Sequence, residues 1–162
     1  MKLKTFMFKD DGSIPNNPNL PLLVYEGAFT STEQFEYTIL EHGWSGTWVD
    51  GVYDYHHYHS TSHEVLGVVS GEAKILFGGE NGTAVAVKQG DVAVIPAGVG
   101  HKCIEKSSDF KVMGAYPDQQ EMDMCTGKKE ERPKALKHIQ NVPLPENDPL
   151  LGKGGPMFDY WK

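Results

Sequence analysis

The feature that most constrains this chain is a histidine-rich stretch at residues 51–71. It reads GVYDYHHYHSTSHEVLGVVSG, with four histidines and one glutamate inside nine consecutive positions. Residues two apart on a β-strand share a face, so His57 and His59 can reach one metal ion from a single strand. The polar residues 60–62 predict a turn, and a hairpin there would return the carboxylate of Glu64 to the two imidazoles. The stretch therefore predicts part of a metal site.

A histidine-rich surface loop would also explain this stretch, but a second segment favours the metal site. Residues 90–101 read GDVAVIPAGVGH, which is an apolar strand, a Pro-Ala-Gly turn and then His101. Pro96 and Gly98 predict a tight turn, so His101 opens the next strand. A third imidazole is thus expected from a part of the chain remote from the first two. Two separated segments that both end in histidine are typical of metal binding.

Composition limits the fold class and the partners. The chain has 162 residues with 18 Gly and 10 Pro, which indicates one domain of short strands joined by turns. Its net charge is −7 and it has no basic stripe, so we expect neither nucleic acid nor an anionic membrane as a partner. The two cysteines are too few for a disulfide framework, and residues 1–10 lack the apolar run of a signal peptide. We therefore expect a cytoplasmic protein with reduced thiols.

The middle of the chain, residues 44–116, has the pattern of an all-β fold. Short apolar or alternating runs are separated by turns rich in glycine, asparagine, serine and proline. The expected strands are 47–53, 55–60, 64–70, 73–77, 83–88, 92–95, 101–106 and 110–116. This many short strands at such spacing predicts a sandwich or barrel.

Extensions are expected on both sides of this β region, at residues 1–43 and 117–162, within a single domain. The expected elements are strands at 2–9 and 22–25, a helix at 30–43, a helix at 131–141 and an extended tail from 142 onward. Residues 65–69 are apolar on both faces of their strand, so both faces need cover. The terminal segments or a second subunit could supply it, and we expect a homodimer.

Both histidine segments resemble the two conserved motifs of the cupin superfamily. The first motif, G-x5-H-x-H-x4-E-x6-G, is matched at Gly51, His57, His59, Glu64 and Gly71. The second motif, G-x5-P-x-G-x2-H-x3-N, is matched at Gly90, Pro96, Gly98 and His101, with Glu105 in place of the final Asn. The segments HYHSTSHEVLGVVSGEA, IPAGVGHKC, GAYPD and VPLPENDP are similar to those of small bacterial single-domain cupins of unassigned activity.

This resemblance implies a double-stranded β-helix, a jelly-roll barrel, around one metal ion. The implied ligands are His57, His59, Glu64 and His101. Three imidazoles and one carboxylate suit Mn, Fe, Co, Ni or Zn, and of these we expect Mn or Fe. Such a set leaves about two positions of an octahedron open for water or substrate, which is the mark of a catalytic rather than a closed structural site.

Two further residues share a face of the predicted strand with His101, namely Cys103 and Glu105, so both are expected inside the barrel. Cys103 is either a small buried hydrophobe or a thiolate that acts on substrate. Glu105 is either a partner that orients a ligand histidine or a general acid or base. Other candidates for the pocket wall are Tyr53, Tyr55 and Tyr116. Structural or surface roles are expected for His42, His56, His63 and His138.

We expect a metal-dependent enzyme that acts on a small, oxygen-rich metabolite, with isomerase, lyase or dioxygenase chemistry. A first alternative is a lyase or transferase that uses Cys103 beside the metal on a sulfur-containing or sugar-like substrate. A second is a non-catalytic module that binds or stores a small ligand. The fold alone does not distinguish these three functions, because one barrel can support many reactions.

Overall fold

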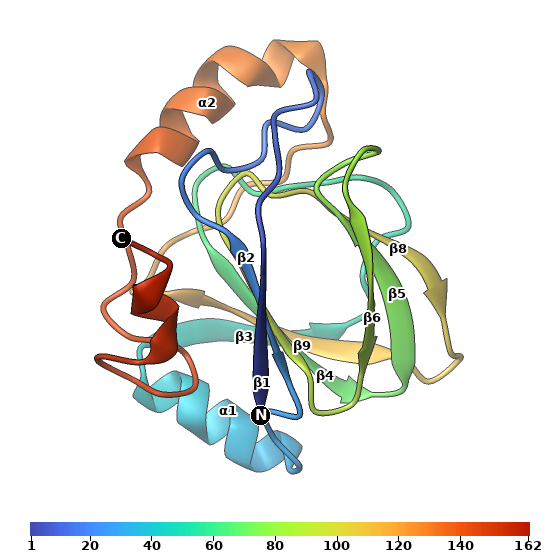
Figure 1. Cartoon of the computed structure of the whole chain (residues 1–162), viewed down its shortest axis with the longest axis vertical. Coiled ribbons are helices and arrows are strands. Elements are labelled where there is room, and N and C mark those ends of the chain that lie inside the picture. Colours follow the sequence, from blue (N-terminus) through green and yellow to red (C-terminus); the bar gives the residue numbers. More distant parts are fainter.

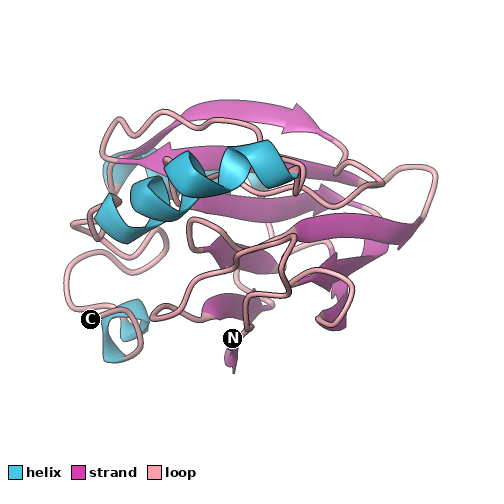
Figure 2. Cartoon of the chain, turned by 90° about the horizontal axis from the view of Figure 1, so that it is seen from above, coloured by secondary structure: helices cyan, strands magenta, loops and turns pink.

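Two antiparallel sheets pack face to face in the computed structural model, which describes residues 1–162 (Figures 1 and 2). The larger sheet has the strand order β1-β2-β7-β4-β9-β3 and the smaller has the order β6-β5-β8. The strands are β1 Lys2–Phe6, β2 Leu22–Glu26, β3 Trp44–Asp50, β4 Glu64–Ser70, β5 Glu72–Phe77, β6 Thr83–Lys88, β7 Val92–Ile95, β8 His101–Lys106 and β9 Lys111–Pro117. The predicted all-β jelly roll is confirmed.

Two short helices flank the sheets, α1 at Thr32–Glu41 and α2 at Arg132–Asn141 (Figure 1). Ser31 caps α1, because its hydroxyl oxygen accepts a hydrogen bond from the backbone N–H of Gln34 at 3.3 Å. Short 3-10 turns lie at Lys129–Glu131 and Pro156–Asp159. Neither helix has the length and apolar character that crossing a bilayer requires.

The strand predicted at residues 55–60 is absent, and that prediction was wrong. These residues form a loop that makes only isolated bridges, from His57 to His101 and from Tyr58 to Cys125. Each residue therefore pairs with a different segment, and no partner strand runs beside them long enough to form a ladder. The alternation of side chains still holds locally, because Tyr58 packs in a separate core cluster while its two histidine neighbours turn the other way.

Both faces of the central strand β4 are covered within this one chain. Its inner face packs against the smaller sheet in the main core. Its outer face, with Val65, packs in a second cluster against Phe35 of α1 and against Met157 and Trp161 near the end of the chain. Gly67 permits this, because a Cβ there would lie 2.4 Å from the Phe35 ring. The terminal segments thus supply the cover that the sequence demands, and the homodimer stays a prediction.

Candidate metal centre

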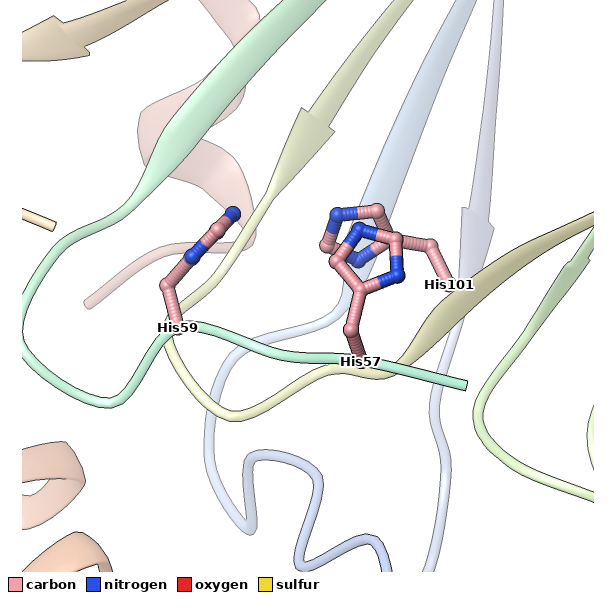
Figure 3. A group of neighbouring side chains, drawn as sticks. All are labelled: His57, His59 and His101. Atoms are coloured by element: carbon pink, nitrogen blue, oxygen red, sulfur yellow. The ribbon is translucent and has the colours of Figure 1, made fainter. Parts of the chain in front are cut away.

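Three histidines converge at one end of the barrel (Figure 3). His57 and His59 come from the loop between β3 and β4, and His101 is the first residue of β8. A pair of backbone hydrogen bonds joins the two segments, His57 N–H to the carbonyl of His101 at 3.3 Å and the reverse at 2.9 Å. All three side chains are buried, and their ligand atoms lie within 4.8 Å of one another. This group is able to hold a metal ion.

Hydrogen bonds to backbone carbonyls fix the tautomer of all three rings. His57 Nδ1 lies 3.1 Å from the carbonyl oxygen of Tyr55, His59 Nδ1 lies 2.6 Å from that of Asp123, and His101 Nδ1 lies 3.2 Å from that of Val99. A carbonyl can only accept, so each Nδ1 donates and carries the ring proton. In the neutral ring, each Nε2 then presents a lone pair, which is what a metal ligand needs.

Glu64, the first residue of β4, brings a buried carboxylate to the same place. Its side chain is 2 % exposed, and its Oε1 lies 3.3 Å from His59 Nε2 and 3.5 Å from His101 Nε2. Oε1 accepts no hydrogen bond of good geometry. Burial alone would raise the pKa of Glu64, but the two imidazoles hold it well below its usual range. Burial lowers the pKa of His57 to about 3, helped by His101, which favours the neutral, ligating form.

The residues present fit a divalent metal ion. Burial would lower the pKa of His59, but the Glu64 carboxylate raises it, so a shared proton between the two groups is favoured when no metal is bound. If the rings are neutral, each Nε2 lone pair and the carboxylate oxygen face each other as two acceptors. A cation between them would satisfy the orphaned Oε1 and the three lone pairs at once. The donor set of three nitrogens and one carboxylate oxygen suits first-row transition metals.

A loop outside the histidine group holds His59 in place through Asp123. The backbone carbonyl of Asp123 accepts the hydrogen bond from the His59 ring. Its carboxylate accepts hydrogen bonds from the backbone N–H and the hydroxyl of Ser60, the former at 2.6 Å, and from the Thr61 N–H at 3.3 Å. The role of Asp123 is not predictable from the sequence, because nothing near it in the chain indicates this long-range contact.

Replacing Asp123 with alanine is expected to destabilise the protein by about 3 kcal/mol, since hydrogen bonds to a charged group contribute about 1.5–3 kcal/mol each and the buried backbone N–H of Ser60 would lose its partner. Urea denaturation followed by circular dichroism measures this loss. Glu121→Ala is the matched control, because Glu121 is an exposed acidic residue of the same loop whose side chain makes no hydrogen bond or ion pair. Equal stability of the two variants would contradict the assigned role.

A cavity of about 470 Å³ opens directly onto the histidines. Glu64 and the three histidines form its floor, and Trp48, Val52, Leu66 and Tyr116 contribute to its walls. Tyr53 also lines it, whereas Tyr55 does not and instead stacks on Tyr53 with ring centroids 4.9 Å apart. Burial raises the pKa of Tyr116, and nearby Glu64 adds to this, so its hydroxyl keeps its proton.

Comparison with known proteins places this architecture in a family. A family model described as "Cupin domain" matches residues 38–113. The uncharacterized protein YjlB of Bacillus subtilis (strain 168) is 51% identical over 158 residues, which span 98% of this chain and 96% of that protein. The chain belongs to the cupin family.

Solved structures with weaker similarity include two bacterial proteins. A DUF861 family protein of Thermotoga maritima has a TM-score of 0.37 and 18% identity, over 59% of this cupin and 96% of that chain. An oxalate decarboxylase of Bacillus subtilis has a TM-score of 0.41 and 15% identity, over 68% of this cupin and 29% of that chain. Similarity at this level says nothing about the activity of this cupin.

Cys103 is placed in the core of this cupin beside the cavity rather than in its wall. Its side chain belongs to the cluster between the two sheets, and its Sγ donates to the backbone carbonyl of Glu105 at 3.6 Å. The cavity lining does not include it. Burial raises the pKa of the thiol, so it carries its proton at neutral pH. These contacts favour the predicted role of Cys103 as a small buried hydrophobic residue over its role as a reactive thiolate.

Glu105 does not point into the barrel, and the orientation predicted for it was wrong. Its side chain is 72% exposed and lies 3.5 Å from the Lys74 ammonium group. The pairing of β5 with β8 shifts register at this point, since Ile75 pairs with Cys103 but Lys74 pairs with Glu105. Such a β-bulge inserts one residue and breaks the two-residue alternation on which the prediction depended.

The other histidines have structural partners, in agreement with the roles expected for them. His56 pairs with Glu80, and His42 Nδ1 donates to the carbonyl of Pro149 at 2.8 Å. His63 Nδ1 accepts a hydrogen bond from the Ala97 N–H at 2.9 Å. His138 Nδ1 lies 3.1 Å from the Ser60 hydroxyl oxygen.

Proposed function

We propose that this cupin is a metal-dependent enzyme whose metal ion is held by His57, His59, His101 and Glu64. The observation that carries the proposal is the convergence of three buried imidazoles beside a buried carboxylate. The Glu64 Oε1 lies 3.3 Å from His59 Nε2 and 3.5 Å from His101 Nε2, and it accepts no hydrogen bond of good geometry. We expect Mn or Fe, with Ni, Co and Zn as further possibilities. Bound there, such an ion supplies a Lewis acid or, in the case of iron, an oxygen-activating centre.

The cavity supports an open site over a closed structural one. A structural metal is surrounded by protein ligands, whereas a catalytic site keeps space for substrate beside the metal. Here the space of about 470 Å³ adjoins the histidines and has the size of a small-molecule pocket. The protein's own part is to orient the imidazoles through their carbonyl partners, to place the Glu64 charge, and to offer the Tyr116 hydroxyl.

Within this proposal, isomerase, lyase and dioxygenase chemistry on a small, oxygen-bearing metabolite all agree with the arrangement. The thiol-assisted alternative loses support, because Cys103 lies outside the cavity lining and its thiol is protonated. A non-catalytic module that binds or stores a ligand would use the same metal and cavity. Ligand binding without turnover, with every metal tested, would favour that module.

Titration of the metal-free protein with divalent metals tests the proposal. We expect one equivalent of Mn, Fe, Co, Ni or Zn to bind per chain, because the chain has one group of three converging histidines, with Glu64 beside two of them. Binding should raise the midpoint of thermal unfolding, since a ligand that binds only the folded state stabilises it. Calorimetry and elemental analysis measure the stoichiometry. Folded protein that binds none of these metals would remove the proposal.

A further inference from the structure

The cavity has a polar floor, whereas its walls and mouth are largely apolar. Hydrogen-bonding and charged groups gather at its buried end, where Glu64 and the histidines lie. Apart from Glu64 and the histidines, the charged lining residues are Asp50 and Lys106, and most of the other lining residues are aromatic, aliphatic or methionine. A site for a wholly polar metabolite would instead carry hydrogen-bond partners along its whole depth, because buried polar groups need them.

Trp48 of β3 builds one apolar wall. Gly114 of β9 makes room for it, because a Cβ at that position would lie 2.4 Å from the indole ring. The indole N–H, its one polar atom, already donates to the Tyr116 hydroxyl at 2.9 Å. The rest of the ring system therefore offers the cavity an apolar surface without an unmet hydrogen bond.

Two exposed methionines form part of the mouth of the cavity. Met122 is 43% exposed and Met124 is 40% exposed, and both line the cavity beside Tyr53, which is 52% exposed. They flank Asp123, whose carboxylate is bound to Ser60, so their loop is tied down close to the site. Exposed apolar side chains gathered around an opening indicate a binding surface, and methionine adapts to varied apolar shapes.

We infer that the substrate is amphipathic, with an oxygen-rich head group at the histidines and an apolar body along Trp48, Met122 and Met124. This rests on the metal site proposed above and narrows its substrate class. The head group would meet the polar floor, where chelating oxygens replace water. The body, an aliphatic chain or an aromatic ring, would lose its contact with water against the apolar walls.

The test compares hydroxamates that share one chelating head group but differ in their apolar body. Metal content is measured first, and acetohydroxamate and hexanohydroxamate are then titrated calorimetrically into the metal-loaded protein. Each fully buried methylene strengthens binding by about fourfold, so the longer probe should bind at least about 30-fold more tightly even with partial burial. Benzohydroxamate, whose ring can lie on Trp48, should show a comparable gain.

A double variant, Met122→Ser with Met124→Ser, tests where the gain arises. This variant should bind hexanohydroxamate at least about fivefold more weakly than the wild type, whereas its affinity for acetohydroxamate should be unchanged. The reason is that the substitutions remove apolar surface only at the mouth of the cavity. Met7→Ser is the matched control, since Met7 is 55% exposed and lies outside the cavity. It should behave as the wild type.

The outcomes separate this inference from the proposal on which it rests. Protein that binds no metal removes both. Metal-loaded protein that binds the two probes equally overturns the inference and leaves the metal centre intact. The inference is also overturned if the double variant keeps the full gain, or if metal-free protein binds hexanohydroxamate as tightly as the loaded form does.

Discussion

Replacing His101 with alanine is expected to weaken divalent metal binding by more than about 100-fold. Loss of a partner that merely orients a ligand typically costs 10–100-fold, so the loss of a ligand itself should cost more. His101 also lies 3.5 Å from the Glu64 carboxylate, so its removal leaves that buried charge with fewer compensating groups. Calorimetric titration measures the affinity, and circular dichroism checks that the variant is folded.

The matched control for this variant is His42→Ala. The His42 ring also bonds a backbone carbonyl through Nδ1, that of Pro149, but it lies outside the metal centre. Its replacement should leave the metal affinity unchanged. An unchanged metal affinity in folded His101→Ala protein would mean that His101 is not a metal ligand.

The histidine group could be predicted from the sequence because two local rules determine where its side chains lie. Residues two apart in extended chain share a side, and this held for His57 and His59 although they lie in a loop with isolated bridges rather than in a strand. Pro96 and Gly98 form a turn, as their residue types predict, and His101 begins β8 directly after it. Both rules depend only on neighbours along the chain.

The remaining parts of the site depend on pairing between distant segments, which sequence periodicity does not encode. The bulge opposite Lys74 turned Glu105 to solvent, and a bulge arises from how two strands register. The loop that carries Met122 and Asp123 is placed by hydrogen bonds to residues about 60 positions earlier in the chain. Polar loops of this kind show no periodic pattern from which to predict a contact.

Trp161→Ala is expected to destabilise the protein by about 3–5 kcal/mol, the usual range for removing a buried tryptophan. Trp161 is 1% exposed in the cluster on the outer face of the larger sheet, and its indole N–H donates to the carbonyl of Pro21 at 2.8 Å. The substitution leaves a cavity and an unpaired buried carbonyl. The midpoint and slope of urea denaturation measure the loss.

Tyr160→Ala is the control, since Tyr160 is the preceding residue, is also aromatic and is 46% exposed. Exposed substitutions usually change stability by less than about 0.5 kcal/mol. If both variants lost the same small amount, the end of the chain would not be part of the core.

The same tryptophan also connects the end of the chain to the metal centre. Its ring packs on His63 with centroids 4.8 Å apart, and His63 directly precedes Glu64. A cavity left by Trp161 would give the start of β4 freedom to move, and the Glu64 carboxylate would be held less firmly. Trp161→Ala should therefore weaken metal binding as well, by less than about tenfold, because all four ligands remain present. A loss as large as that of His101→Ala would mean that the tail maintains the geometry of the site and does not only cover the sheet.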